Sequence, residues 1–176
     1  MLAKGLAAVA LVLGGWACGY RAVHGGDAPV ERYAVVLASS SVPDVVASDE
    51  VVAGVREELA KNGALASGDA YPRCEVEVLR ADESAEGIGA ARNPDGVLLP
   101  DARATRVGVV ARAWLVRRKD GPRERDTGDV RALDTIAVAP NARAASFQHT
   151  DALRSAARRA GTRMGARLLG RPSAGE

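Results

Sequence analysis

The stretch TRVGVVARAWL, residues 105–115, decides how this chain folds. Apolar or small residues alternate along it with positions such as Arg106, Arg112 and Trp114. A period of two residues is the pattern of a β-strand with one buried face. The residues expected on the buried face are Thr105, Val107, Val109, Ala111, Ala113 and Leu115.

A second strand is expected directly after the first. Lys119-Asp120-Gly121 is typical of a hairpin turn, and residues 127–138 again alternate. Asp134 interrupts the apolar face of this return strand, which predicts a β-bulge or an edge position there.

Three elements precede this pair of strands. Residues 33–38 are apolar on both faces, which predicts a strand at the centre of a sheet or covered on both sides. A helix is expected from about Ser48, whose hydroxyl would cap it, to Asn62-Gly63, with an apolar stripe along one side. Residues 74–79 alternate and predict another strand. The stripe consists of Val51, Val52, Val55 and Leu59.

Residues 82–103 contain Gly, Pro and Asn and have no clear period. They are therefore expected to form a connection of about 20 residues, a length that is usually functional or disordered.

The last element is a helix over residues 147–169. Its apolar residues are spaced by three and four, as in a helix with one buried face. The seam consists of Leu153, Ala157, Ala160, Met164 and Leu168. The remaining surface carries Arg154, Arg158, Arg159, Arg163 and Arg167, which could face a partner or acidic headgroups, or form an ordinary charged outer face.

The element order is β-α-β-β-β-α, which predicts an α+β domain over residues 32–170. The expected architecture is a four-stranded mixed sheet with two helices on one face. Residues 171–176 are expected to be a disordered tail.

Composition limits the function. The chain has 176 residues, 47% of them hydrophobic and 26% charged, so it suits one compact domain. Aromatic residues make up only 3%, which leaves no stacking platform for nucleic-acid bases, and no nucleic-acid partner is expected. Residues 18–101 hold 7 basic and 15 acidic residues, whereas residues 102–171 hold 16 basic and 6 acidic ones. An acidic and a basic surface are therefore expected.

No enzyme is expected. The sequence has no phosphate-binding glycine loop and no paired-cysteine or zinc-protease motif. Its two histidines, His24 and His149, offer little for a metal site or a catalytic triad. The sequence therefore predicts a binding or structural protein with no metal and no cofactor beyond a covalent lipid.

The first seventeen residues resemble a bacterial lipoprotein signal peptide. Lys4 precedes an apolar run from Leu6 to Leu13, which is too short to span a membrane. Gly15-Trp16-Ala17-Cys18 resembles a lipobox, which implies a lipid on the sulfur of Cys18, and Gly19 after the cysteine is the choice compatible with the outer membrane. Residues 18–31 would then be a lipidated N-terminus and flexible tether. An ordinary secretory signal and an uncleaved anchor are the alternatives.

The second cysteine, Cys74, occupies an apolar position of its strand and is expected to be buried and inert. A disulfide with Cys18 is the alternative if the protein is exported without a lipid.

The hairpin tip concentrates cations. They are Arg117, Arg118, Lys119, Arg123 and Arg125. Such a cluster suits an anionic ligand, although the interleaved Asp120, Glu124 and Asp126 would equally suit a solvated, salt-bridged hairpin.

Cys18-Gly19-Tyr20-Arg21 after such a leader, the element order and the Ala/Arg-rich last helix together resemble the LPS-assembly lipoprotein family, LptE-like. The resemblance implies an outer-membrane lipoprotein, facing the periplasm and a barrel lumen. It implies a protein that plugs and helps assemble the β-barrel lipopolysaccharide translocon (LptD-like) and binds lipopolysaccharide. The five cations of the hairpin tip are the contact residues expected for that ligand. Ser39-Ser40-Ser41-Val42-Pro43 departs from the family pattern after the first strand.

A second reading places the chain among other α/β lipoproteins, as an activator of a peptidoglycan synthase or an accessory of a secretion pore. Those proteins also place a strand, a Ser/Pro loop and a helix in the order of residues 33–62.

Overall fold

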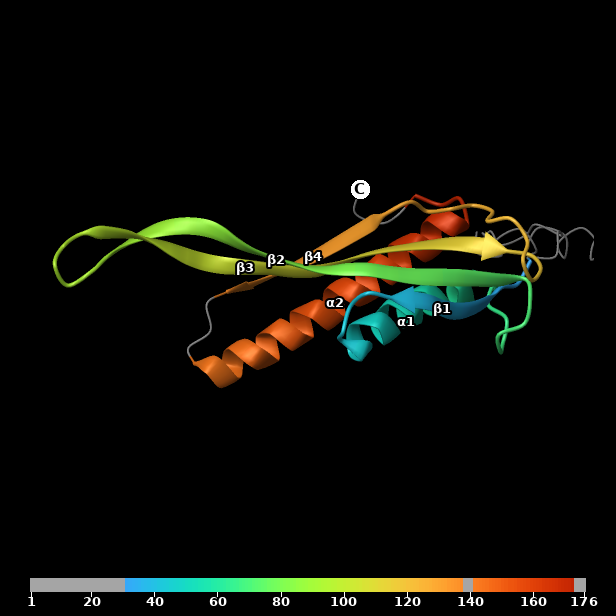
Figure 1. Ribbon diagram of the computed structural model, residues 1–176, viewed down its shortest axis with the longest axis horizontal. Coiled ribbons are helices and arrows are strands. Elements are labelled where there is room, and N and C mark those ends of the chain that lie inside the picture. The colour runs from blue at the N-terminus through green and yellow to red at the C-terminus, as the bar shows by residue number, and fades with distance from the viewer. Residues whose placement is uncertain (1–30, 138–140, 173–176) are drawn as a thin grey trace, which may run out of the picture.

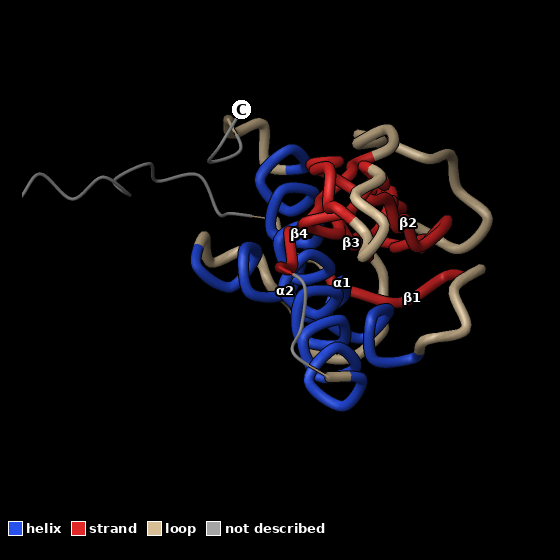
Figure 2. Tube along the Cα trace, turned by 90° about the vertical axis from the view of Figure 1, so that its left-hand side faces the viewer, coloured by secondary structure: helices blue, strands red, loops and turns tan. Residues whose placement is uncertain are grey.

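The computed structural model describes residues 31–137 and 141–172. Cys18, the expected signal peptide, the expected tether before Glu31 and the end of the expected tail lie outside the described residues. The fold is α+β, with four strands in one mixed sheet and both helices on the same side of it (Figures 1 and 2). The expected fold class and element order are therefore confirmed. The elements are β1 Ala34–Ser40, α1 Val45–Lys61, β2 Arg73–Arg92, β3 Leu98–Val116, β4 Val130–Ala137 and α2 Ala142–Leu168.

The strand order in the sheet is β1-β2-β3-β4. β1 runs parallel to β2, and the other two pairs are antiparallel. The prediction of a central or doubly covered first strand is wrong, because β1 lies at an edge. Ala34 and Val35 at its start are buried, whereas Leu37 to Ser40 are exposed, and Tyr33 just before the strand exchanges backbone hydrogen bonds with Ala64 and Ala66.

The prediction of a long connection over residues 82–103 is also wrong. β2 and β3 continue through it and pair from Arg73↔Val116 to Arg92↔Leu98, forming a hairpin that extends beyond both helices (Figure 1). Glu83, Ser84 and Ala85 are all exposed. α2 reaches only the start of this segment, where His149 lies 3.5 Å from Glu83, and beyond it the hairpin extends past both helices, which therefore impose no period of two.

The start of α1 differs from the prediction. Asp44, not Ser48, is the N-cap, and its carboxylate accepts a hydrogen bond from the Ala47 amide at 3.1 Å. Ser48 lies one turn inside the helix, where its buried hydroxyl is 2.8 Å from that of Ser40. Asn62 ends the helix as expected.

The core lies between the sheet and the helices. The expected apolar stripe of α1 and the expected seam of α2 are all buried, and they pack against Cys74, Val76 and Val78 of β2. The helices cross at backbone distance: a Cβ built on Gly161 would lie 2.1 Å from the Val51 carbonyl oxygen, and one built on Gly54 would lie 2.2 Å from that of Arg158. Glycine is required at this crossing.

Asp134 lies in β4, which is an edge strand with no register shift against β3. The expected edge position is confirmed and the bulge is absent. The Asp134 carboxylate pairs with Arg159 of α2 at 3.1 Å. Burial raises the pKa of Asp134, but hydrogen bonds from Ser155, Arg159 and the Thr135 amide outweigh that effect and lower it overall.

None of the helices in the described part of the chain is both long enough and apolar enough to cross a membrane.

Candidate functional site at the basic end

The five cations predicted as a cluster lie on the connection between β3 and β4, at the end of the sheet where β2 begins. We call Arg117, Arg118, Lys119, Arg123 and Arg125 the basic end. Glu124 exchanges two backbone hydrogen bonds with Leu115, of 2.7 and 2.8 Å, so this connection is tied back to the sheet. The Asp120 and Arg125 backbones lie in the left-handed region, with φ of 57° and 47°. The connection is therefore a defined loop and not a simple two-residue hairpin turn.

Arg117 joins the basic end to the start of the described chain. Its Nε donates to the Glu124 carboxylate at 2.8 Å, and its Nη1 donates to the carboxylate of Glu31. The Tyr33 hydroxyl donates to the same Glu31 carboxylate at 2.6 Å. The chain from Cys18 therefore enters the domain beside the basic end.

Arg123 covers the indole of Trp114, with its guanidinium carbon 3.8 Å from the ring centroid. The Trp114 Nε1 donates to Glu75 at 3.0 Å, and Glu75 also pairs with Arg73 at 2.7 Å. Trp114 is only 2% exposed although it lies on the sheet face without helices. Arg123 thus acts as a lid on an aromatic side chain, in the stacked geometry that favours Arg over Lys.

Arg125 has a structural partner as well. Its Nη1 donates to the Leu168 carbonyl oxygen at 3.2 Å, at the C-terminal end of α2. A cation at this position satisfies an unpaired helix carbonyl and interacts favourably with the helix dipole.

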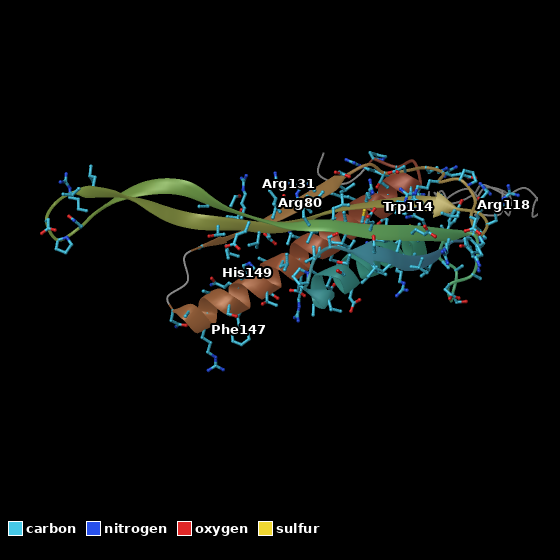
Figure 3. All side chains as sticks on the ribbon, in the orientation of Figure 1. Arg80, Trp114, Arg118, Arg131, Phe147 and His149 are labelled. Atoms are coloured by element: carbon cyan, nitrogen blue, oxygen red, sulfur yellow. The ribbon has the colours of Figure 1, made fainter. Side chains whose placement is uncertain are left out.

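Arg118 and Lys119 differ from the other three. Within residues 31–137 and 141–172 neither side chain has a hydrogen bond or an ion pair, and both residues are exposed. Figure 3 shows Arg118 at the end of the molecule, beyond Trp114. The structure thus divides the predicted cluster into three cations that hold the loop and two that are available to a ligand.

The face of the sheet without helices carries further arginines that the sequence reasoning did not single out. Arg112 pairs with Glu77 at 2.7 Å, which lowers the pKa of Glu77. Asp82 bridges Arg80 and Arg131, at 3.0 and 2.8 Å, across β2 and β4 (Figure 3). The polar residues that alternate with apolar ones along the strands indicate this polar face. The ion pairs between strands could not be predicted, because they depend on the register in which the strands pair.

Most α2 arginines are committed within the domain. Arg159 and Arg163 donate to the carbonyl oxygens of Leu133 and Arg131 on the outer edge of β4, at 2.8 and 3.1 Å. Arg158 pairs with Glu50 and Glu57 of α1, each at 3.0 Å. These side chains hold the helix to the sheet and to α1, so they are poor candidates for a partner or for lipid headgroups.

The one histidine among the described residues, His149, lies 3.5 Å from the Glu83 carboxylate. The described residues contain no group of three or more metal-ligating side chains. Cys74 is buried, and burial raises the pKa of its thiol to about 12, as expected for an inert cysteine.

The fold is similar to that of two bacterial lipoproteins. A minor lipoprotein from Acinetobacter baumannii superposes with a TM-score of 0.52 at 12% identity, over 81% of this chain and 94% of that one. A structure from Caulobacter crescentus assigned as a lipoprotein gives 0.50 at 13% identity, over 77% and 88%. The rare lipoprotein B from Shewanella oneidensis gives 0.47 at 15% identity, over 78% and 94%. No protein-family model and no curated protein matches the sequence. At identities of 12% and 13%, the likeness to the first two structures establishes the fold alone.

Proposed function

We propose that this protein is an outer-membrane lipoprotein, anchored through Cys18, that plugs and helps assemble the β-barrel lipopolysaccharide translocon and binds lipopolysaccharide. The observation that carries the proposal is the combination of a fold found in bacterial lipoproteins with a cysteine directly after a short apolar leader. The Cys18-Gly19-Tyr20-Arg21 opening supports the more specific assignment to LPS assembly.

The position of the basic end supports a role near the membrane. The segment from Cys18 to Glu31 spans at most about 45 Å when fully extended. Because Glu31 is paired with Arg117, an anchored protein would hold the basic end within that distance of the bilayer. The narrow elongated shape, with the hairpin projecting from the other end, suits a protein that reaches into a partner (Figure 1).

Arg118 and Lys119 are the residues proposed to contact lipopolysaccharide. Their charges are exposed and uncompensated in the described structure, and lipopolysaccharide carries phosphates and acidic sugars. A guanidinium pairs with phosphate through two parallel hydrogen bonds. Arg117, Arg123 and Arg125 are assigned the supporting role of holding the loop that presents these two side chains.

The partner is tested by affinity purification of the tagged protein from detergent-solubilised outer membranes. We expect a large β-barrel in near one-to-one yield. Recovery of a peptidoglycan synthase or a secretion pore instead would support the second reading of the sequence and overturn the translocon assignment. Mass spectrometry of the same sample should show an acylated Cys18 at the N-terminus. In the Cys18→Ala variant, the protein that is not bound to a barrel should appear in the soluble periplasmic fraction.

Ligand binding is tested by charge reversal. Arg118→Glu combined with Lys119→Glu should weaken lipopolysaccharide binding by roughly tenfold or more, because hydrogen bonds to charged groups contribute about 1.5–3 kcal/mol each. The matched control is Arg143→Glu with Arg154→Glu, two exposed arginines of α2 outside the basic end. Equal loss in both variants would indicate a general charge effect and refute a specific site.

A further inference from the structure

The projecting hairpin has two long edges whose main chain is unpaired in the described residues. β1 last pairs with β2 at Ser40↔Val78, and β4 last pairs with β3 at Ala104↔Ala137. Beyond these positions, within the described residues, β2 and β3 pair only with each other, as far as Arg92↔Leu98. We call residues 82–103 the arm. Figure 1 shows it extending past the ends of both helices.

Parts of the outer edges of the rest of the sheet are covered. On β4 the carbonyl oxygens of Arg131 and Leu133 accept from Arg163 and Arg159 of α2. On β1 the Val35 carbonyl oxygen accepts from Arg56 of α1 at 2.9 Å. Exposed strand edges are templates for pairing with other chains, and proteins normally cover or blunt them. The arm extends the sheet beyond these covered positions.

The free backbone groups of the arm can be assigned to alternate residues. The Val78 carbonyl oxygen accepts from the Ser41 amide, so even-numbered residues of β2 face β1 before the register shift between Val78 and Arg80. After the shift the even-numbered residues face β3 and the odd-numbered ones face outward. Glu83 and Ala85 thus begin a row of outward N–H and C=O groups along β2, in line with the position that β1 leaves vacant.

Apart from Glu83 and Glu86, the sequence of this edge lacks the residues that blunt an edge. Residues 83–91, ESAEGIGAA, contain neither Pro nor Lys and consist mainly of Gly, Ala and Ser. Small residues let another backbone approach closely. In addition, a two-stranded hairpin is at best marginally stable in water, and pairing with a third strand would stabilise it.

We propose that the β2 edge of the arm, residues 83–91, pairs with an extended strand of the partner protein, which continues the sheet in line with β1. The pairing is β-augmentation, in which main-chain hydrogen bonds supply the affinity. Only the identity of the partner rests on the proposed function, where it is a segment of the translocon barrel. The arm would then be an ordered part of a three-stranded sheet in the complex.

Hydrogen exchange measured by mass spectrometry tests the pairing directly. The full acylated protein is compared in isolated outer membranes and after purification alone in detergent. Peptides from residues 80–92 should exchange at least about tenfold more slowly in the membrane, because their outward amides become hydrogen bonded. Peptides from residues 105–116, which are paired on both sides over much of their length, serve as the internal reference. Equal exchange of the arm in both states overturns the proposal.

A proline substitution tests the edge itself. Ala85→Pro removes an outward N–H and leaves the ladder to β3 in place, whereas Ala85→Thr keeps the N–H at the same exposed position. Recovery of the partner should fall roughly tenfold for Ala85→Pro and remain unchanged for Ala85→Thr, with equal melting temperatures for the two free proteins. Equal recovery would refute a role for the edge.

Two further outcomes separate this inference from the proposed function. If the arm exchanges more slowly in the membrane but the affinity purification recovers no barrel, the result would support strand pairing and overturn the translocon assignment. If two differently tagged copies of the chain co-purify and Ala85→Pro separates them, the strand comes from a second copy, and the pairing with a different partner protein is overturned.

Discussion

The crossing of α1 and α2 gives the sharpest test of the packing. Gly161→Ala would place a Cβ 2.1 Å from the Val51 carbonyl oxygen and 2.9 Å from the Gly54 Cα. Both of these atoms belong to the backbone, so no side-chain rotation relieves the clash. α2 would have to move away from α1 by about 1 Å for the new contacts to reach van der Waals distance, which loosens the core on both sides of the crossing.

The size of the effect follows from two opposing terms. Alanine is favoured over glycine in a helix by about 1 kcal/mol. Overpacking a close-packed site costs about 1–3 kcal/mol, and the rigid backbone on both sides places this site near the upper limit. The expected net loss is about 2 kcal/mol, which corresponds to a fall in melting temperature of roughly 6–10 °C for a domain of this size.

Urea unfolding followed by far-ultraviolet circular dichroism measures this loss. The matched comparison is Gly165→Ala, one turn further along α2, where the added Cβ lies 2.7 Å from the Glu58 Cβ and 3.4 Å from the Val55 carbonyl oxygen, a smaller overlap than the 2.1 Å at Gly161. Gly165→Ala should therefore cost less. A Gly161→Ala protein as stable as the wild type would mean that the two helices are not in backbone contact, and the description of the core would be wrong.

Two further predictions concern a buried thiol and a covered edge. Burial raises the pKa of Cys74 from 9.0 to about 12, so the contribution of this thiol to stability is fully present below pH 9 and is lost progressively between pH 9 and 12. The free energy of unfolding of the wild type should fall by about 1.4 kcal/mol per pH unit in this range, and that of Cys74→Ala should fall less. Parallel pH profiles of the two proteins in urea unfolding would contradict this. The double variant Arg159→Ala with Arg163→Ala should expose the β4 carbonyl groups and cause concentration-dependent association in analytical ultracentrifugation. Arg154→Ala, at an arginine that donates to no edge carbonyl group in the described residues, should sediment as the wild type does. A monomeric double variant would show that Arg159 and Arg163 do not protect the edge.

The extent of prediction differs between the fold and the site. The alternation over residues 105–115 and the seam of α2 were sufficient for the fold class, because the pattern repeats wherever one face of an element is buried. The same argument explains the main error. Most of the arm extends past both helices, which impose no period of two on its residues, and pairing across the hairpin defines it.

For the site, the order of residues along the chain predicted that five cations lie together. It could not predict which of them hold the loop and which are available to a ligand. Which cation stacks on Trp114, which one caps α2 and which two remain exposed depends on distances between segments that are far apart in the sequence. The α2 arginines illustrate the same limit: their spacing of four residues predicts a charged helix face, but only the position of β4 beside that face makes Arg159 and Arg163 donors to its edge.

The sequence by itself therefore determined the period of each buried element, the turns between most of them, the buried thiol and the acidic and basic halves of the chain, since these depend on neighbouring residues alone. Tertiary structure decided the edge position of β1, the Asp44 cap of α1, the glycine crossing of the helices, the length of the arm and the partners of each arginine. These features arise where elements meet or fail to meet, and the free energy that selects them comes from contacts and hydrogen bonds between distant segments.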